Sequence, residues 1–143
     1  MQKNIITELI TFLLIVLFTY AAITKLADYQ KFSVQLAQSP LLSKFSTLLV
    51  FTIPALEIVI SLLLAFSYTR LLGLYVAFIL LVVFTAYIVY ILLFSPHIPC
   101  SCGGVLEDLG WGEHVIFNLI FVLMASTAIL QTVKHNNASR GLI

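Results

Sequence analysis

The two cysteines of the chain, Cys100 and Cys102, stand one residue apart in the segment HIPCSCGG, residues 97–104. Two thiols at this spacing can close a disulfide only where the backbone turns, because their Cα atoms must approach within roughly 4.4–6.8 Å. The proline before the pair and the glycines after it, Gly103 and Gly104, are suited to such a turn. A small, strained disulfide is easily reduced, so the pair is typical of thiol–disulfide exchange.

Neighbouring groups can set the reactivity of these thiols. Gly103 and Gly104 can direct backbone N–H groups at a thiolate. His97 precedes the pair in the same segment, and His114 starts the next apolar segment; either could exchange protons with a thiol. The sequence therefore predicts an electrostatically tuned redox pair.

Two other interpretations of the cysteines stay open. The pair could be a structural disulfide, although a loop closed across one residue gains little entropic stabilisation. Together with His97, the thiols could bind Cu(I) or Zn(II). Two thiols and one histidine fall short of a closed tetrahedral site, so we predict no metal centre.

The chain around the cysteines is strongly apolar: 62% of its 143 residues are hydrophobic and 9% are charged. Soluble domains average about 45–50% apolar and roughly 25% charged residues. A folded domain of ~150 residues buries only about 70% of its unfolded surface, so water is a poor solvent for this composition. The net charge of +1 indicates no basic patch, and we expect no nucleic-acid partner. The expected environment is the lipid bilayer.

Four segments have the length and apolarity of a membrane-crossing helix, which needs about 20 residues. They cover about residues 5–26, 47–67, 71–94 and 114–133. Backbone polar groups cannot stay unpaired in hydrocarbon, so each segment is expected to be helical. Residues 1–143 are therefore predicted to form a single all-α transmembrane domain, an antiparallel four-helix bundle with the cysteine segment between its third and fourth helices.

Four spans place both termini on one side of the membrane. That side collects four of the seven Lys and Arg residues, and the other side collects three. Positive residues favour the cytoplasm, and a close pair of thiols does redox work most readily on the oxidising side. We therefore expect cytoplasmic termini and an outward-facing cysteine segment.

Charged side chains within the spans are expected to face the bundle interior, because a charge in hydrocarbon is costly. Lys25 ends the first span, Asp28 follows it, and Glu57 lies within the second span. We predict a Lys25–Glu57 ion pair with Asp28 as a further candidate member. It would serve either as a proton relay or support for the cysteine segment, or as a contact that fixes packing. Asn118 lies one turn after His114, and we expect it to form an interhelical hydrogen bond, with ligand binding as the alternative.

The sequence resembles the MauE/DoxX-like group of small four-span membrane proteins, whose bacterial members are associated with redox chemistry. The resemblance covers nearly the whole chain. It rests on KLAD at residues 25–28, PLL at 40–42, Pro54 with Glu57, FTAY at 84–87, CSCGG at 100–104, and WGEH at 111–114 followed by Asn118.

This resemblance implies periplasmic disulfide chemistry at a bacterial inner membrane, in a bundle similar to those of the DsbB and vitamin K epoxide reductase enzymes. Those enzymes pass electrons from a thioredoxin-fold partner to a quinone. A multi-pass thiol–disulfide oxidoreductase is thus expected, with a redox-active Cys100–Cys102 disulfide, a periplasmic thioredoxin-fold or cysteine-containing partner and a quinone acceptor. The residues expected to support the pair are His97, Gly103, Gly104, Glu113, His114, Asn118, Lys25, Asp28 and Glu57.

One departure from that pattern bears on the function. The enzymes named above use more than one cysteine pair, whereas this chain has a single C-x-C. The alternative function is therefore a non-catalytic membrane subunit that anchors a periplasmic redox or Cu/Zn-handling protein.

Overall fold

The computed structural model describes residues 4–39, 42–94 and 110–141 of the chain. Four long helices dominate this part: α1 (Ile5–Ala27), α3 (Ser46–Ala65), α4 (Arg70–Phe94) and α5 (Trp111–Gly141). The described residues also contain a short helix, α2 (Tyr29–Gln38), and a single 3₁₀ turn, η1 (Ser43–Phe45), but no strand. Each long helix is long and apolar enough to cross a membrane. The predicted all-α, four-span architecture is confirmed.

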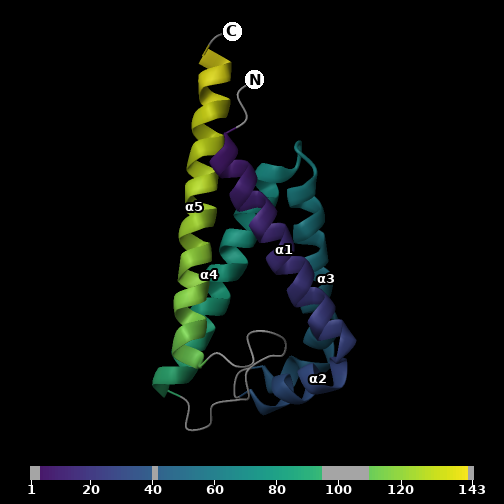
Figure 1. Ribbon diagram of the computed structural model, residues 1–143. Coiled ribbons are helices and arrows are strands. Elements are labelled where there is room, and N and C mark those ends of the chain that lie inside the picture. Colours follow the sequence, from purple (N-terminus) through teal and green to yellow (C-terminus); the bar gives the residue numbers. More distant parts are fainter. Residues whose placement is uncertain (1–3, 40–41, 95–109, 142–143) are drawn as a thin grey trace.

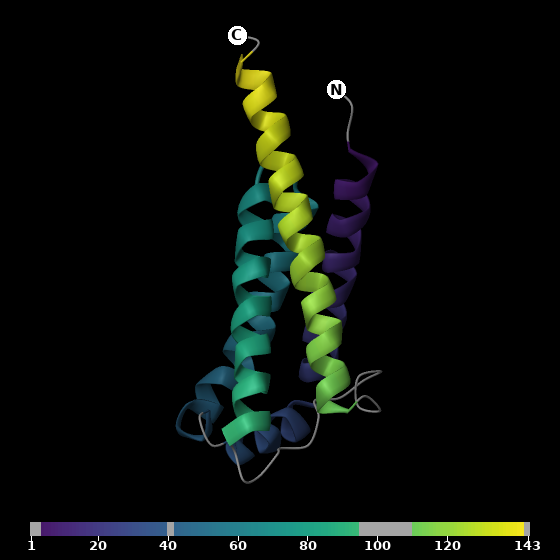
Figure 2. The ribbon, with the colours of Figure 1, turned by 90° about the vertical axis from the view of Figure 1, so that its left-hand side faces the viewer.

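The long helices form an antiparallel bundle (Figures 1 and 2). α1 packs mainly against α3, and α4 packs mainly against α5; contacts of α3 with α4 and of α1 with α5 close a ring. In Figure 1 the start of α1, the α3–α4 turn and the end of α5 lie on one side, here called the termini end. α2 lies across the opposite side, the α2 end, where α4 ends and α5 begins. In this ring α3 and α5 occupy opposite corners.

A tight turn at residues 66–69 joins α3 to α4 and makes them antiparallel neighbours. The last carbonyls of α3 are satisfied there: Thr69 Oγ1 donates to the Leu63 carbonyl at 2.9 Å, and Arg70 Nε donates to the Leu64 carbonyl at 3.3 Å. Gly73, in the first turn of α4, lies against the same carbonyl-bearing residues. A Cβ on Gly73 would meet the Leu64 nitrogen at 3.0 Å.

Gly73→Ala is therefore expected to destabilise the bundle by about 1–3 kcal/mol, because the added methyl group meets backbone atoms that yield only if α3 shifts. The readout is the midpoint of thermal unfolding in detergent micelles. Gly141→Ala is the matched control, since a Cβ there would have no neighbour within 4 Å. Equal midpoints for the two variants would contradict the close α3–α4 contact.

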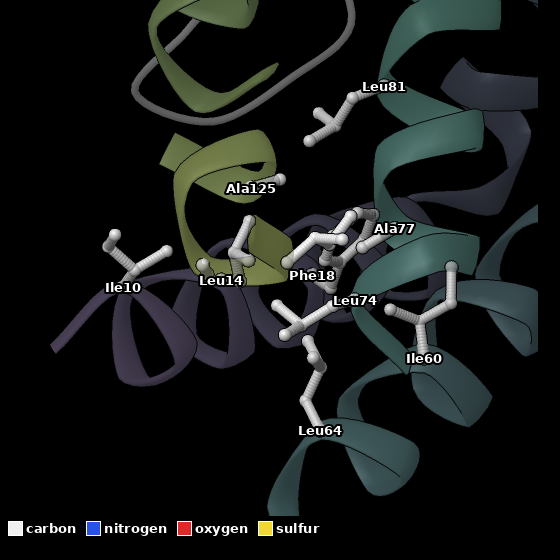
Figure 3. Close-up of a cluster of buried hydrophobic side chains, with 11 residues drawn as sticks. Ile10, Leu14, Phe18, Ile60, Leu64, Leu74, Ala77, Leu81 and Ala125 are labelled. Carbon is white, nitrogen blue, oxygen red and sulfur yellow. The ribbon is translucent and has the colours of Figure 1, made fainter. Parts of the chain in front are cut away.

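The apolar core lies toward the termini end. Figure 3 shows Leu14 and Phe18 of α1 and Leu74 of α4 gathered between the helices. All four long helices contribute to this core: Ile10, Leu14, Phe18, Ile60, Leu64, Leu74, Ala77, Leu81, Ala125, Ala128 and Ile129. A second, smaller cluster of Phe32, Leu36 and Val50 attaches α2 to α3.

The helix bounds differ from the predicted spans most clearly in α5. The sequence predicts a span over residues 114–133, whereas the helix runs from Trp111 to Gly141. At 1.5 Å per residue, its 31 residues make it about 46 Å long, well beyond the ~30 Å of hydrocarbon. The extra turns, residues 134–141, are exposed and extend past the other helices at the termini end (Figure 1). Apolarity predicts only the membrane-embedded part, because a helix continues on its own backbone hydrogen bonds.

Candidate functional site

Buried polar side chains gather in the half of the bundle nearest the α2 end. Glu57, Thr85, His114 and Asn118 are each more than nine-tenths buried. Each lies on the α2 side of the core residues contributed by its own helix. We call Lys25, Glu57, His114 and Asn118 the polar cluster. Because burying polar groups in a membrane protein costs free energy, their concentration at one end marks this end as the candidate site.

Lys25 and Glu57 form the ion pair that the sequence predicts. Lys25 Nζ on α1 lies 2.5 Å from Glu57 Oε1 on α3, and the side chains are 17% and 7% exposed. Lys25 Nζ also lies 5.8 Å from the ring centre of Phe32, a cation–π contact with α2. The second carboxylate oxygen, Glu57 Oε2, is buried and has no hydrogen-bond partner within the described ranges.

Asp28 and Glu113 are helix caps in the structure. Asp28 Oδ1 accepts a hydrogen bond from the Lys31 backbone nitrogen at 3.2 Å and so begins α2. Among the described residues Asp28 forms no ion pair with Lys25, contrary to the prediction that it could join the Lys25–Glu57 pair. Glu113 Oε2 accepts from the Gly110 backbone nitrogen at 3.3 Å, which fixes the start of α5. Both acids therefore position helices around the polar cluster.

His114 and Asn118 are brought to the same face of α5 by their spacing of one helical turn. The His114 ring stands edge-on to Phe84 of α4, with centroids 6.4 Å apart and an interplanar angle of 69°. Both residues lie on the α2 side of the core residues of α5, as Glu57 does on α3. The interhelical hydrogen bond expected for Asn118 is not formed by its Nδ2, which is buried and unpartnered in residues 4–39, 42–94 and 110–141.

The cysteine segment, with Cys100, Cys102, His97, Gly103 and Gly104, lies outside the described residues. The two helix ends that flank it are described: α4 ends at Phe94 and α5 begins at Trp111, both at the α2 end (Figure 1). The predicted roles of these five residues stay predictions.

Sequence reasoning missed one link at the α2 end. Ser39 Oγ and Tyr87 Oη form a hydrogen bond that ties the end of α2 to α4. Gln35, also on α2, is buried as well. The available signal was Tyr87 itself, because the hydroxyl group of a tyrosine within a membrane-crossing helix favours a hydrogen-bond partner.

Polar contacts at the termini end lock α1 to its neighbours. Gln131 Oε1 on α5 accepts from Asn4 Nδ2 at 2.9 Å and from Thr7 Oγ1 at 2.8 Å. Glu8 and Arg70 form an ion pair at 2.6 Å between α1 and the start of α4. Opposite charges on the same side of two spans were the signal that could have found this pair.

The comparisons with known proteins give one match. Residues 3–131 match the family described as methylamine utilisation protein MauE. No curated protein and no solved structure gives a significant match. The matched range takes in the polar cluster and both cysteines, and it ends within α5. The chain is thus a multi-pass membrane protein that belongs to the family of methylamine utilisation protein MauE.

Proposed function

We propose that the chain is a thiol–disulfide oxidoreductase of a bacterial inner membrane, with Cys100 and Cys102 as its redox-active pair. The observation that carries this proposal is the gathering of buried polar groups in the half of the bundle nearest the α2 end, the end at which α4 stops and α5 begins on either side of the cysteine segment. Polar groups buried in hydrocarbon cost free energy, and Glu57 and Asn118 each keep an atom without a partner in the described residues, which a role in packing alone does not explain.

The exchange with a partner protein needs both sulfurs. A thiolate of one cysteine attacks a disulfide of the partner, so a mixed disulfide forms and the partner's second sulfur leaves as a thiolate. The other cysteine of the chain then attacks the mixed disulfide. This step releases the partner as a dithiol and leaves a Cys100–Cys102 disulfide. The same steps in reverse take two electrons from a reduced partner, which is a thioredoxin-fold or other cysteine-containing periplasmic protein.

A quinone is the proposed membrane acceptor for these electrons. When bound, a quinone supplies an acceptor of two electrons and two protons, the number that a dithiol gives up on forming a disulfide. The polar cluster fits such a head group, because Asn118 Nδ2 offers a buried donor and Glu57 Oε2 a buried acceptor. Lys25 holds the Glu57 carboxylate in place through Oε1.

We propose that the termini lie in the cytoplasm and the α2 end at the periplasm. The cations that favour a cytoplasmic termini end are Lys3, Arg70, Lys134 and Arg140; those at the other end are Lys25, Lys31 and Lys44. Lys25 is neutralised by Glu57, so it adds little to the positive charge of the α2 end. The exposed last turns of α5 carry Lys134 and Arg140 beyond the bundle.

Single serine substitutions test the exchange directly. In Cys100→Ser or Cys102→Ser, a remaining nucleophilic thiol can attack a partner but cannot be resolved, so a covalent complex should accumulate. The variant that keeps the nucleophile should give the stronger complex. Non-reducing electrophoresis of membranes would show a larger band that reduction removes, and mass spectrometry would identify the partner.

The controls separate exchange from orientation. The double variant Cys100→Ser/Cys102→Ser must form no complex. A membrane-impermeant maleimide added to intact cells should abolish trapping, because the thiols face outward; trapping that resists it would contradict the orientation. If neither single variant yields a mixed disulfide, the proposal that the chain is an oxidoreductase is wrong. The alternative function, a non-catalytic anchor for a periplasmic redox or Cu/Zn-handling protein, then takes its place.

A further inference from the structure

We propose that Asn118 and Glu57 form the binding site of the quinone head group, and that this site holds the hydroquinone more tightly than the quinone. The inference rests on the proposed function, which makes a quinone the electron acceptor. It adds the redox form of the head group that these residues recognise and the direction in which they drive the electrons.

Two buried polar side-chain atoms lack hydrogen-bond partners in the described part of the chain. Glu57 Oε2 is an acceptor and Asn118 Nδ2 is a donor, and neither forms a hydrogen bond with any described residue. Both residues are more than nine-tenths buried. Buried polar atoms in native proteins are nearly always satisfied, so an unsatisfied donor and an unsatisfied acceptor in one half of a bundle require an explanation.

These two atoms do not satisfy each other because their helices are not neighbours. Glu57 is on α3 and Asn118 is on α5, which stand at opposite corners of the ring. α1 packs against both helices, and Glu57 and Asn118 each lie on the α2 side of the core residues of their own helix. The two atoms therefore lie in the same half of the bundle, but they belong to helices at opposite corners of the ring. A molecule lying between these helices would satisfy both.

The position of these two atoms and their hydrogen-bonding character restrict the chemistry of the ligand. The site lies within membrane-crossing helices, so a ligand that reaches it must be soluble in lipid, and it must both accept and donate a hydrogen bond. Asn118 Nδ2 can donate to a quinone carbonyl or to a hydroquinone hydroxyl oxygen. Glu57 Oε2 can accept only from the hydroxyl, because a carbonyl has no proton to give and is repelled by a carboxylate. The reduced head group is therefore the better fit.

This preference sets a direction for the electrons. A site that binds the reduced form more tightly makes the bound quinone a stronger acceptor, because binding and reduction are thermodynamically linked. The overall change is that two thiols lose two electrons and two protons as one S–S bond forms, while one quinone gains them as a hydroquinone. The site thus favours oxidation of the chain's dithiol and, through it, of the periplasmic partner.

Calorimetric titration of the full chain in lipid nanodiscs with a short-tailed benzoquinone, oxidised or reduced under anaerobic conditions, tests the site. We expect the wild-type chain to bind the reduced form about tenfold more tightly, as one charge-assisted hydrogen bond allows. Glu57→Gln should bring this ratio close to unity, because the glutamine amide can donate to a carbonyl as well as accept. Asn118→Leu should weaken binding of both forms about tenfold.

The stability of the ligand-free variants distinguishes a binding role from a packing role. Asn118→Leu removes a buried donor that has no partner, so it should leave thermal stability without ligand unchanged or raise it while quinone affinity falls. Gln131→Leu is the matched control on the same helix: its amide oxygen accepts from Asn4 and Thr7, so stability should fall while quinone affinity is kept.

The outcomes separate this inference from the proposed function. If the wild-type chain binds neither form, or if Asn118→Leu binds both as the wild type does, the polar cluster holds water only and the inference is overturned. Mixed-disulfide trapping does not require the quinone, so it would stand in that case. Failure of trapping would overturn the proposed function whatever the titrations show.

Discussion

Replacing Lys25 with methionine is expected to lower the free energy of unfolding by about 3 kcal/mol, because it removes one partner of a buried ion pair and leaves the other charged. Glu57 would lose its contact with Lys25 Nζ at 2.5 Å through Oε1, and its Oε2 already has no hydrogen-bond partner in the described residues. Methionine keeps the length of the lysine stem, and its sulfur can replace the cation–π contact with a sulfur–aromatic contact to Phe32. The measurement is unfolding in mixed detergent micelles.

The double variant Lys25→Met/Glu57→Leu separates the charge effect from packing. With both charges gone, most of the lost stability should return, as for other buried pairs replaced by apolar residues. Glu8→Gln is the matched control: the Glu8–Arg70 pair has a similar distance of 2.6 Å, but the Glu8 side chain is 39% exposed. The free energy of unfolding should fall by less than about 1 kcal/mol in Glu8→Gln. Equal losses in Lys25→Met and Glu8→Gln would show that burial does not set the strength of the Lys25–Glu57 pair.

The same double variant decides between the two roles predicted for the ion pair. A chain that regains stability and still exchanges electrons at the wild-type rate uses the pair only to fix packing. A stable chain that has lost the exchange uses the pair in the reaction. Stability alone cannot make this distinction, because the two roles require the same contact.

The features predicted best from the sequence are those that hydrocarbon enforces. Apolar runs give the four helices, since no other structure satisfies their backbone in lipid. The Lys25–Glu57 pair was predictable for the same reason: two opposite charges at similar depth in antiparallel spans gain most by meeting. The α3–α4 turn followed from the short polar segment between two such runs. In each case the cost of leaving polar or charged groups unpaired in hydrocarbon dominates the free energy, so few alternative structures are possible.

The features that escaped prediction depend on how the helices are arranged around the ring. Apolar faces are nearly equivalent in lipid, so the sequence does not say that α3 and α5 stand at opposite corners. In that arrangement Glu57 on α3 cannot partner Asn118 Nδ2 on α5, and no described residue of α1 or α4 does so either. The Ser39–Tyr87 hydrogen bond likewise depends on where α2 crosses the end of the bundle. Asp28 could not be assigned between ion pair and helix cap, since both uses suit a carboxylate just after Lys25.

The largest expected effect belongs to the cysteines. Either Cys100→Ser or Cys102→Ser should reduce catalysed electron transfer to the rate of empty vesicles, as completely as the double variant does. One sulfur forms the mixed disulfide and the other resolves it, so residues that act as a unit give effects that do not add. The measurement is the oxidation of dithiothreitol by a short-tailed benzoquinone, followed by absorbance, with the chain reconstituted in lipid vesicles.

The completeness of this loss follows from the cysteine count. In an enzyme with two pairs, removing one leaves a partial reaction at the other, whereas the single C-x-C of this chain must meet both partner and acceptor. Ser101→Ala, between the two thiols, is the control and should keep the wild-type rate. The serine variants should unfold as the wild type does, because a disulfide across one residue adds little stability. A single variant that retained a measurable share of the rate would show that one sulfur suffices, and the dithiol mechanism would be wrong.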